Sequence, residues 1–599
     1  MTPLKFLIFA ACIISPAIAA PPAKTAERMQ QFEQGLLPAV LVDGEVPARK
    51  SLRERMAELK VPGISVAVIH GGKLDWARGY GVTKLDGSPV TETSLFQAAS
   101  ISKPVFAAAI LHLVDQGELK LDTNVNEYLE SWKLPDNEFT ANEKVTLRRL
   151  LSHSAGLTVH GFRGYADGEK VPTTVQILDG SPPANSAAIR VDIVPGSRVR
   201  YSGGGYTLAQ RVLTDVTGVP LPKLLKDTVL MPFGMKSSTY EQPLPNARAA
   251  EVALPYRGDG TPVPGGPHTY PEMAAAGLWT TPSDLAHYAL GVIDALAGKS
   301  KVISAATARA MLTPVIGNQG IGPQLGGSTP RKYFVHNGGN EGYRCVLVAY
   351  EDGEGAVVMT NGDNGGGLMY EVLRTLAHVY EWPDFGPSKR ALANVKPEVL
   401  NRLTGVYELE DQSVYVVRRD GAQLVGNIIG NVPVALFPSA ETELFARDLD
   451  VAVAFTPGAD GAVDALKHRA YGHERAGKRV DDARARKVLE AVARDTQRIK
   501  EQKVDPRTGP AIRKLISGIT SGKPDYDAMS PQLADLTRDQ LKGLSDWFTG
   551  LGTLKTLTFQ RVTESGADEY LVEFEKGKLR IDMGVDADGV MHNVHLEPR

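Results

Sequence analysis

The sequence predicts an α+β fold: an antiparallel β-sheet flanked by helices, followed by a small β-barrel domain and a C-terminal α+β domain. Its 599 residues exceed the roughly 250 to 300 that one hydrophobic core supports, so two or three domains are expected. Strand-like runs at both ends of residues 64–380 enclose a helical middle, which is typical of one sheet built from two distant segments and covered by helices. The periodicity stops at 383–387 and resumes as short, closely spaced strands, which indicates a domain boundary.

The first nineteen residues are expected to be an export signal. Lys5 gives a positive start, residues 6–15 form an apolar run, and Ala17-Ile18-Ala19 supplies small residues for cleavage after Ala19. We therefore expect a secreted or periplasmic protein. No later stretch reaches about 18 consecutive apolar residues, so stable membrane insertion after signal cleavage is not expected. Lipidation of Cys12 is an open alternative, although Phe9 is unusual three positions before such a cysteine.

Composition narrows the classes of partner. The apolar fraction of 43%, the charged fraction of 23% and the net charge of −3 are close to those of ordinary soluble globular proteins. Neither nucleic acid nor a membrane surface is therefore expected as a partner. Outside the signal only Cys345 remains, so no intramolecular disulfide is expected.

Residues 20–390 carry the elements of the predicted sheet and its helices. Helical patterns are expected first, and then a β-branched run at 64–69 that Gly71-Gly72 turns back into 74–81 as a hairpin. A helix with a buried apolar face opens at Ser100 and runs to about Gln116. The remaining expected elements are the leading helices 26–37 and 49–59, the strands 333–335, 344–351 and 356–360, and the amphipathic helix 368–380.

Two further domains are expected after the boundary. In residues 391–478, short strands from 403 to 471 with turns at Arg419-Asp420-Gly421 and Asp460-Gly461 predict a small β-barrel or sandwich. Residues 479–599 are helical and charged first and strand-like afterwards, which predicts an α+β unit. Its expected helices are 481–499 and 533–548, and its expected strands are 554–562, 569–575, 578–583 and 590–596.

A hydroxyl and an amine stand three residues apart at the start of the helix that opens at Ser100. Residues at this spacing share one helix face, so Lys103 would lie beside Ser100. A serine hydroxyl is a weak nucleophile until a base takes its proton, and a lysine in a desolvated pocket can be that base. The helix N-terminus favours the developing alkoxide, and Pro104 is tolerated only in a first turn. The spacing alone is also compatible with an ordinary solvated helix start.

Two later motifs carry groups that could act with this pair. Tyr201 precedes a glycine-rich turn that begins at Gly203, and its phenol could pass a proton to a leaving group. His336-Asn337-Gly338-Gly339 ends a strand, where glycines let a substrate backbone lie close to the edge. A structural tyrosine and an ordinary surface histidine are the alternatives. The scattered histidines show no metal-ligand spacing, so no metal and no cofactor is expected.

In this order the three motifs resemble the signatures of class C β-lactamases, penicillin-binding DD-peptidases and related esterases and D-aminopeptidases. Ser100-Ile101-Ser102-Lys103 resembles Ser-x-x-Lys, Tyr201-Ser202-Gly203 resembles Tyr-x-Asn, and His336-Asn337-Gly338 resembles Lys/His-x-Gly. The resemblance covers about residues 50–382 and implies a β-lactamase/transpeptidase-like fold. Supporting stretches are 150–157, 232–235 and 276–285.

The resemblance also implies roles for individual residues. Ser100 would form an acyl-enzyme, Lys103 would deprotonate it and Tyr201 would relay the proton. The backbone N–H groups of Ser100 and Gly339 would form the oxyanion hole. His153 lies in a stretch that is structural in the family. Residues 391–478 are similar to lipocalin-like appendages of D-aminopeptidase-like and esterase-like members, whereas the role of 479–599 stays open.

Two departures from the family pattern bear on the substrate. Gly203 stands where β-lactamases and DD-peptidases have an asparagine that reads the acyl side chain of the substrate. His336 replaces the usual lysine of β-lactamases, and a neutral imidazole holds a substrate carboxylate less well than an ammonium. We therefore expect an exported serine hydrolase for a small ester or peptide substrate. The alternatives are a β-lactamase or DD-carboxypeptidase and a non-catalytic penicillin-recognising sensor, and the oligomeric state is open.

Overall fold

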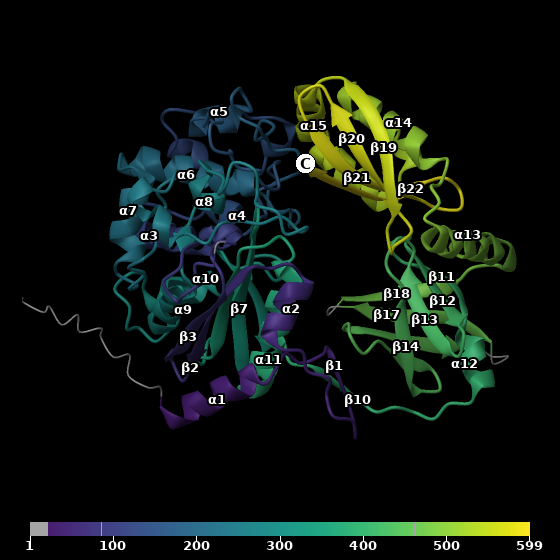
Figure 1. Ribbon diagram of the computed structural model, residues 1–599. Helices are drawn as coiled ribbons and strands as arrows, with labels where there is room; N and C mark the ends of the chain where they lie inside the picture. Colours follow the sequence, from purple (N-terminus) through teal and green to yellow (C-terminus); the bar gives the residue numbers. More distant parts are fainter. Residues whose placement is uncertain (1–21, 86, 459–461, 471–472, 599) are drawn as a thin grey trace, which may run out of the picture.

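The computed structural model describes residues 22–85, 87–458, 462–470 and 473–598, which form a sheet-and-helix unit, a barrel and a C-terminal unit (Figure 1). The expected export signal, Cys12 and the expected turn at Asp460-Gly461 lie outside the described residues. Together the three units have the α+β architecture that the sequence predicts, and the fold class is confirmed.

A six-stranded antiparallel sheet forms the centre of the first unit, in the order β3-β2-β9-β8-β7-β6. Strand β2 from the start of the chain pairs with β9 from the end of the unit, with Val66 opposite Val358. The edge strand β6 was not expected, because its two glycines hide the alternation of the strand. The strands are β2 (Gly63–His70), β3 (Lys73–Gly81), β6 (Gln324–Ser328), β7 (Arg331–Asn340), β8 (Tyr343–Tyr350) and β9 (Gly355–Thr360).

Helices cover both faces of this sheet because its central strands are buried on both sides. In β2, Val66 and Val68 point into one core with α1 (Ala23–Glu33), α2 (Leu52–Glu58) and α11 (Gly365–Val379). Ala67 and Ile69 point into the larger core on the other face. That core includes α3 (Ser102–Asp115), α4 (Leu147–Leu151), α5 (Thr174–Asp179), α6 (Gly203–Thr217), α7 (Leu221–Leu225), α8 (Met273–Ala276), α9 (Pro282–Leu296) and α10 (Ala305–Met311).

The second unit is a closed eight-stranded barrel that follows the short helix α12 (Pro397–Leu403). Leu403, expected to begin the first strand, instead ends this helix. The barrel runs on to Arg479, beyond the expected last strand. Its strands are β11 (Gly405–Leu409), β12 (Val414–Asp420), β13 (Gln423–Ile428), β14 (Val434–Ala440), β15 (Glu443–Phe445), β16 (Val451–Pro457), β17 (Val463–Ala470) and β18 (His473–Arg479).

A two-stranded parallel ribbon joins the first unit to the barrel. Its strands are β1 (Val40–Val42) and β10 (Ser388–Arg390), which come from opposite ends of the first unit. Val40 packs with Phe445 on the outside of the barrel, and Arg447 forms an ion pair with Glu45. The chain thus passes from the first unit to the barrel through β10 (Figure 1), and the segment of β1 adds noncovalent contacts with the barrel.

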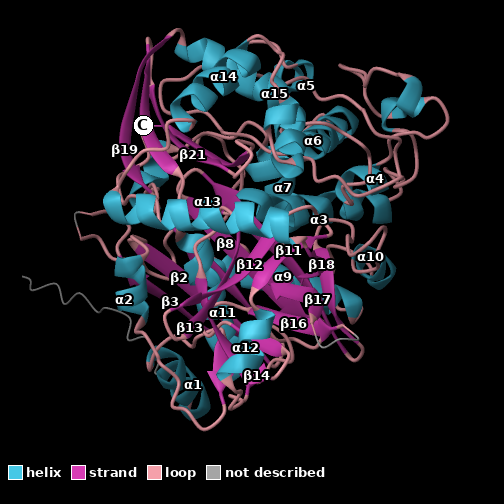
Figure 2. Cartoon of the chain, turned by 90° about the vertical axis from the view of Figure 1, so that its right-hand side faces the viewer, coloured by secondary structure: helices cyan, strands magenta, loops and turns pink. Residues whose placement is uncertain are grey.

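In the C-terminal unit, two helices, α14 and α15, pack against the four-stranded antiparallel sheet β19-β20-β21-β22, whereas α13 contacts the barrel strand β11. Helix α14 was not expected, because Gly509 and Pro510 stand in its first turn. The elements are α13 (Asp482–Glu501), α14 (Thr508–Thr520), α15 (Pro531–Leu551), β19 (Leu554–Val562), β20 (Asp568–Phe574), β21 (Lys578–Val585) and β22 (Met591–Pro598). Figure 2 shows these helices and strands beside the barrel.

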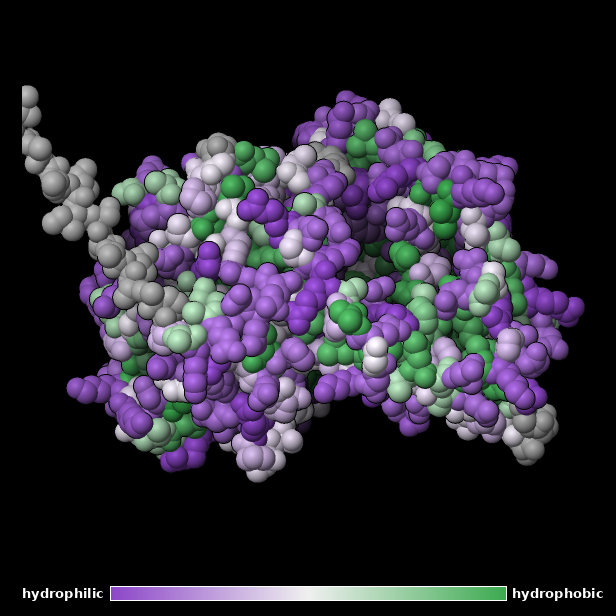
Figure 3. Space-filling view, turned by 60° about the horizontal axis from the view of Figure 1, so that its bottom comes forward, coloured by the Kyte–Doolittle hydropathy of each residue, from purple (hydrophilic) through white to green (hydrophobic). Residues whose placement is uncertain are grey.

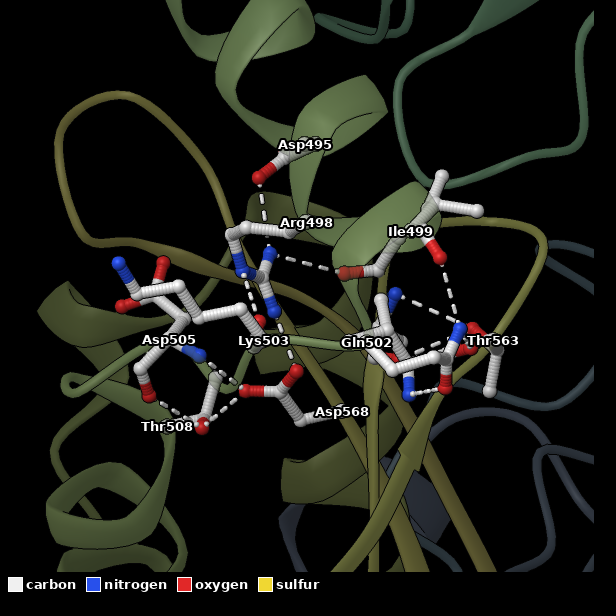
Figure 4. A network of polar contacts seen from close by, with 12 residues as sticks. Asp495, Arg498, Ile499, Gln502, Lys503, Asp505, Thr508, Thr563 and Asp568 are labelled. Carbon is white, nitrogen blue, oxygen red and sulfur yellow. Dashed lines mark hydrogen bonds and ion pairs between the residues drawn. The ribbon is translucent and has the colours of Figure 1, made fainter.

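A buried charged network connects α13, α14 and β20 (Figure 4). The Arg498 guanidinium donates to the carboxylates of Asp495 and Asp568. Asp568 also accepts the Thr508 hydroxyl at 2.7 Å and the backbone N–H of Asp505 at 2.8 Å. The network therefore links the end of α13 and the start of α14 to strand β20, with both charged partners buried and further hydrogen-bonded.

Polar side chains cover much of the face in Figure 3, with apolar ones between them, and the surface is hollowed near the centre of this view. Among the described residues, no helix combines the length and the apolar character needed to cross a membrane.

Candidate active site

Ser100 lies in a tight turn that the surrounding chain holds in place. The turn is a 3₁₀ segment over Ala99–Ile101, and the α-helix expected from Ser100 begins at Ser102, which leaves Pro104 in its first turn. Ala99 has a φ of 47°, a strained conformation for a residue with a side chain. The Ser102 hydroxyl donates to Ala99 O at 2.5 Å and accepts the Leu278 N–H at 3.0 Å. These bonds stabilise the strained turn and the position of Ser100.

Lys103 is buried directly beside Ser100. Its Nζ lies 3.0 Å from Ser100 Oγ and 2.8 Å from the carbonyl oxygen of Ala275 in α8. Only 2% of the side chain is exposed, and Nζ also lies over the ring of Tyr201, 4.9 Å from its centre. The amine is thus positioned to exchange a proton with the serine hydroxyl.

Tyr201 stands between aromatic rings at the N-terminus of α6. The imidazole of His153 stacks on its ring with centres 4.1 Å apart, and that of His160 is tilted at 4.9 Å. His153 Nδ1 accepts the N–H of Ser202, so Nε2 carries the proton of the neutral ring. Burial, reinforced by the charge of Lys103, lowers the pKa of His153 well below its usual range. A neutral His153 therefore holds the ring of Tyr201 in place.

His336 faces Tyr201 from strand β7, with ring centres 6.5 Å apart. Burial, reinforced by the charge of Lys103, lowers the pKa of His336 to about 3. Its Nδ1 donates to the carbonyl oxygen of Asn337 at 2.7 Å. His336 is therefore uncharged near neutral pH, and it is buried rather than the surface histidine of the alternative interpretation.

The glycines of β7 let the strand lie against the turn of Ser100. A Cβ atom at Gly338 would fall 2.3 Å from Ala98 O and 2.4 Å from Cys345 Sγ, so only glycine fits there. Gly339 is exposed to the cavity, and a Cβ on it would have no contact closer than 3.6 Å. The strand therefore brings the backbone of Gly339 to the same cavity as Ser100.

The sequence suggested that Gly203 begins a glycine-rich turn, but in the structure Gly203 is the first residue of helix α6. Ser202 caps α6, because its hydroxyl accepts the Gly205 N–H at 2.9 Å, and the three glycines form the first turn of that helix. None of them has a positive φ. Crowding, rather than backbone conformation, therefore decides which side chain fits at position 203.

The candidate residues line one cavity of about 330 Å³. This volume suits a small substrate. Ser100, Lys103, Tyr201, Gly203, His336 and Gly339 all line it, whereas Gly338 is not a lining residue and lies against Ala98 and Cys345. Asn337 and Ala276, which lie within the motif at 336–339 and the stretch 276–285, also line it. Further lining residues that the sequence did not indicate are His160, Gly161, Phe162, Ala275, Gln324 and Asn340.

Asn340 is a residue of the site that the sequence motifs did not indicate. It follows Gly339 directly, and its side-chain amide donates to Gln97 Oε1 at 2.7 Å and to Ala276 O at 3.2 Å. It thus connects β7 to the segment before Ser100 and to α8, which holds Lys103. The only feature of the sequence that could have indicated Asn340 is its position directly after the motif at 336–339.

Comparison with known proteins identifies a matching family and several similar proteins. The family model described as Beta-lactamase matches residues 48–379. Penicillin-binding protein 4 of Amycolatopsis lactamdurans is 28% identical over 376 residues, which is 59% of this chain and 94% of that protein. Esterase EstB of Burkholderia gladioli is 31% identical over 223 residues, 36% of this chain and 54% of that protein. The octameric penicillin-binding protein homologue from Pyrococcus abyssi superposes with a TM-score of 0.49 at 24% identity, over 71% of this chain and 98% of that one.

Proposed function

The chain belongs to the Beta-lactamase family of serine hydrolases, and on that basis we propose that it cleaves an ester or amide through an acyl-enzyme on Ser100. One observation carries the proposal: Lys103 Nζ lies 3.0 Å from Ser100 Oγ within a cavity that Tyr201 also lines. A nucleophile in hydrogen-bond contact with a buried amine is the arrangement that serine acyl transfer requires.

The reaction uses the groups that meet in the cavity. Ser100 Oγ attacks the substrate carbonyl carbon while its proton passes to Lys103 Nζ, which takes part in its unprotonated form. The carbonyl oxygen becomes an oxyanion that accepts the backbone N–H groups of Ser100 and Gly339. The C–O or C–N bond then breaks, and the leaving group takes a proton by way of Tyr201. Water attacks the acyl-enzyme in the second half, releases the acid and returns the proton to Ser100.

The charges around the cavity favour esters or amides over β-lactams, which carry a carboxylate. Among the cavity-lining residues that the structure describes, Lys103 is the only lysine or arginine. Arg344, next to Gly339, is held by Asp363 at 2.9 Å and by the carbonyl oxygen of Asn340 at 2.6 Å. With His336 uncharged as well, a substrate carboxylate finds little attraction here. The esterase among the relatives supports the same preference.

The alternatives give different results in one experiment. The contact between Ser100 and Lys103 argues against a non-catalytic sensor, which does not need an activating base. Purified protein is compared on p-nitrophenyl butyrate, D-amino-acid amides and penicillin. The ester or the amides should give the highest kcat/KM, whereas faster penicillin hydrolysis would favour a β-lactamase, and binding without turnover a sensor.

The nucleophile is tested by covalent labelling. A fluorophosphonate probe should label the parent protein and the control Ser197→Ala, whose serine is exposed outside the cavity. Ser100→Ala should not be labelled, while its circular dichroism stays that of the parent. Equal labelling of Ser100→Ala and parent would show that another group is the nucleophile.

Lys103 and Tyr201 should act as one unit with Ser100. Each of Lys103→Ala and Tyr201→Phe should lower kcat by about 10²- to 10⁴-fold, since each interrupts the same proton path. The double variant should be about as slow as the slower single variant. Losses that multiply in the double variant would mean that the two groups act independently.

We also propose that the protein is exported, secreted or periplasmic, on the strength of its charged, apolar and small-residue N-terminal pattern. N-terminal sequencing of the protein recovered from cell fractions should give Ala20 as the first residue. Recovery of unprocessed protein from the cytoplasm alone would reject the proposal.

A further inference from the structure

The ring of Phe162 fills the space that a side chain at position 203 would need. A Cβ atom on Gly203 would lie 3.0 Å from Phe162 Cε2 and 3.2 Å from the carbonyl oxygen of His160. Both residues line the cavity that contains Ser100. Where the family pattern has an asparagine amide, this chain therefore has the phenyl ring of Phe162.

Hydrogen bonds hold the backbone of residues 158–160 against the start of α6, two residues before Phe162. The N–H groups of Gly203 and Gly204 donate to the carbonyl oxygens of His160 and Val159, each at 3.0 Å. The Ser202 hydroxyl donates to Thr158 O at 2.8 Å. Phe162 itself is half-buried and packs against the main hydrophobic core.

Resting on the proposed function, we propose that Phe162 determines the acyl specificity of this site and that the substrate is an ester or amide of an apolar acyl group. An alkyl or aryl chain can pack against the ring, whereas an acyl group with its own amide would lose its hydrogen bonds to water. No amide at position 203 compensates that loss. The neighbouring Gly161 leaves room beside the ring, because a Cβ there would meet nothing within 4 Å.

The test compares two acyl groups of similar length, p-nitrophenyl valerate and p-nitrophenyl N-acetylglycinate. Each kcat/KM is divided by the rate of hydroxide-catalysed hydrolysis of the same ester, which removes the difference in intrinsic reactivity. The parent protein should prefer the valerate by about tenfold or more. The amide of the N-acetylglycyl group would be buried beside Phe162 without hydrogen-bond partners, which weakens its binding. Equal corrected values for the two esters would overturn the proposal.

Variants of the ring then assign the preference to Phe162. Phe162→Ala should lower the valerate preference by at least about fivefold, and the apolar Phe162→Leu should keep most of it. Phe139→Ala is the matched control, because Phe139 packs on the same core but does not line the cavity, and it should retain the parent's preference. An unchanged preference in Phe162→Ala would overturn the assignment.

A paired substitution tests the space itself. Gly203→Asn alone should lower activity on both esters, because the new side chain meets the Phe162 ring. Combining it with Phe162→Ala should restore activity and favour the N-acetylglycinate, since the amide then has both room and a partner. No restoration in the double variant would contradict the steric argument.

Labelling by a fluorophosphonate separates this proposal from the one on which it rests. Suppose that the parent is labelled at Ser100 but Phe162→Ala has the same ratio of corrected kcat/KM values for the two esters as the parent. The hydrolase proposal then stands, and the proposal on acyl specificity is wrong. If the parent hydrolyses no ester or amide and is not labelled, both fall.

Discussion

The buried carboxyl group of Glu272 should make the stability of the catalytic unit depend on pH. Its side chain is fully buried, and neither carboxyl oxygen has a hydrogen-bond partner among the described residues. Burial raises the pKa of Glu272 from 4.5 to about 8. The residue directly precedes α8, whose Ala275 carbonyl holds Lys103. Glu272→Gln keeps the shape of the side chain and removes its ionisation.

The sign and size of the effect follow from the two pKa values. Between them the folded state keeps a proton that the unfolded state releases, so the contribution of Glu272 to stability is greatest below pH 4.5 and falls as the pH rises towards 8. Each pH unit in this range costs about 1.4 kcal/mol, and the loss reaches about 3 kcal/mol at pH 7. Glutamine has no such loss, because it does not titrate.

Calorimetry between pH 5 and 8 measures this difference on the transition of the catalytic unit. Glu272→Gln should unfold near the parent's temperature at pH 5 and several degrees above it at pH 7.5. The exposed Glu118→Gln controls for the loss of a carboxylate and should follow the parent at every pH. Parallel profiles of Glu272→Gln and parent would show that the carboxyl is ionised or partnered in the folded protein, and the reasoning would fail.

Three further predictions concern the packing of the site and of the C-terminal unit. Gly338→Ala should reduce kcat by about 10²-fold or more with little change in circular dichroism, because the new methyl group collides with Ala98 O and shifts the strand, and overpacking costs about 1–3 kcal/mol. Asn340→Ala should lower kcat by about tenfold with KM nearly unchanged, since two buried hydrogen bonds that align the site are lost, and steady-state kinetics would show the reverse if the residue only binds substrate. Asp568→Ala should destabilise the C-terminal unit by about 3–5 kcal/mol by leaving Arg498 buried without its main partner. Limited proteolysis should then cut residues 481–599 first, and parent-like resistance would mean that water reaches the guanidinium.

Local patterns in the sequence were enough for the central strands of the sheet and for the closeness of Ser100 and Lys103, but not for the edge strand β6. Strand β2 is a β-branched run that alternates between two cores, so its period and its burial agree. The spacing of Ser100 and Lys103 follows from helix geometry, and the distance of 3.0 Å agrees with it. The pairing of β1 with β10 could not be read in the same way, because it joins segments more than 340 residues apart through only three residues each.

The specificity of the site also depends on contacts between distant segments. The sequence indicated that Gly203 lacks an amide, but not that Phe162 takes its place, because that requires the path of 158–162 across α6. No local pattern marks Glu272 as buried, since its burial arises from the packing around α8. Residues of this kind become visible only when the neighbours of each side chain are known.

The ribbon of β1 and β10 has a practical consequence for dissecting this protein. The two strands lie on either side of residues 48–379, the segment that matches the family, so a fragment trimmed to those limits loses both. A separately produced barrel would expose Phe445 and its apolar neighbours to solvent and should aggregate. A protease nick at 383–387 would, in contrast, leave the halves attached through β1. Active fragments should therefore begin before Leu37 and retain the barrel.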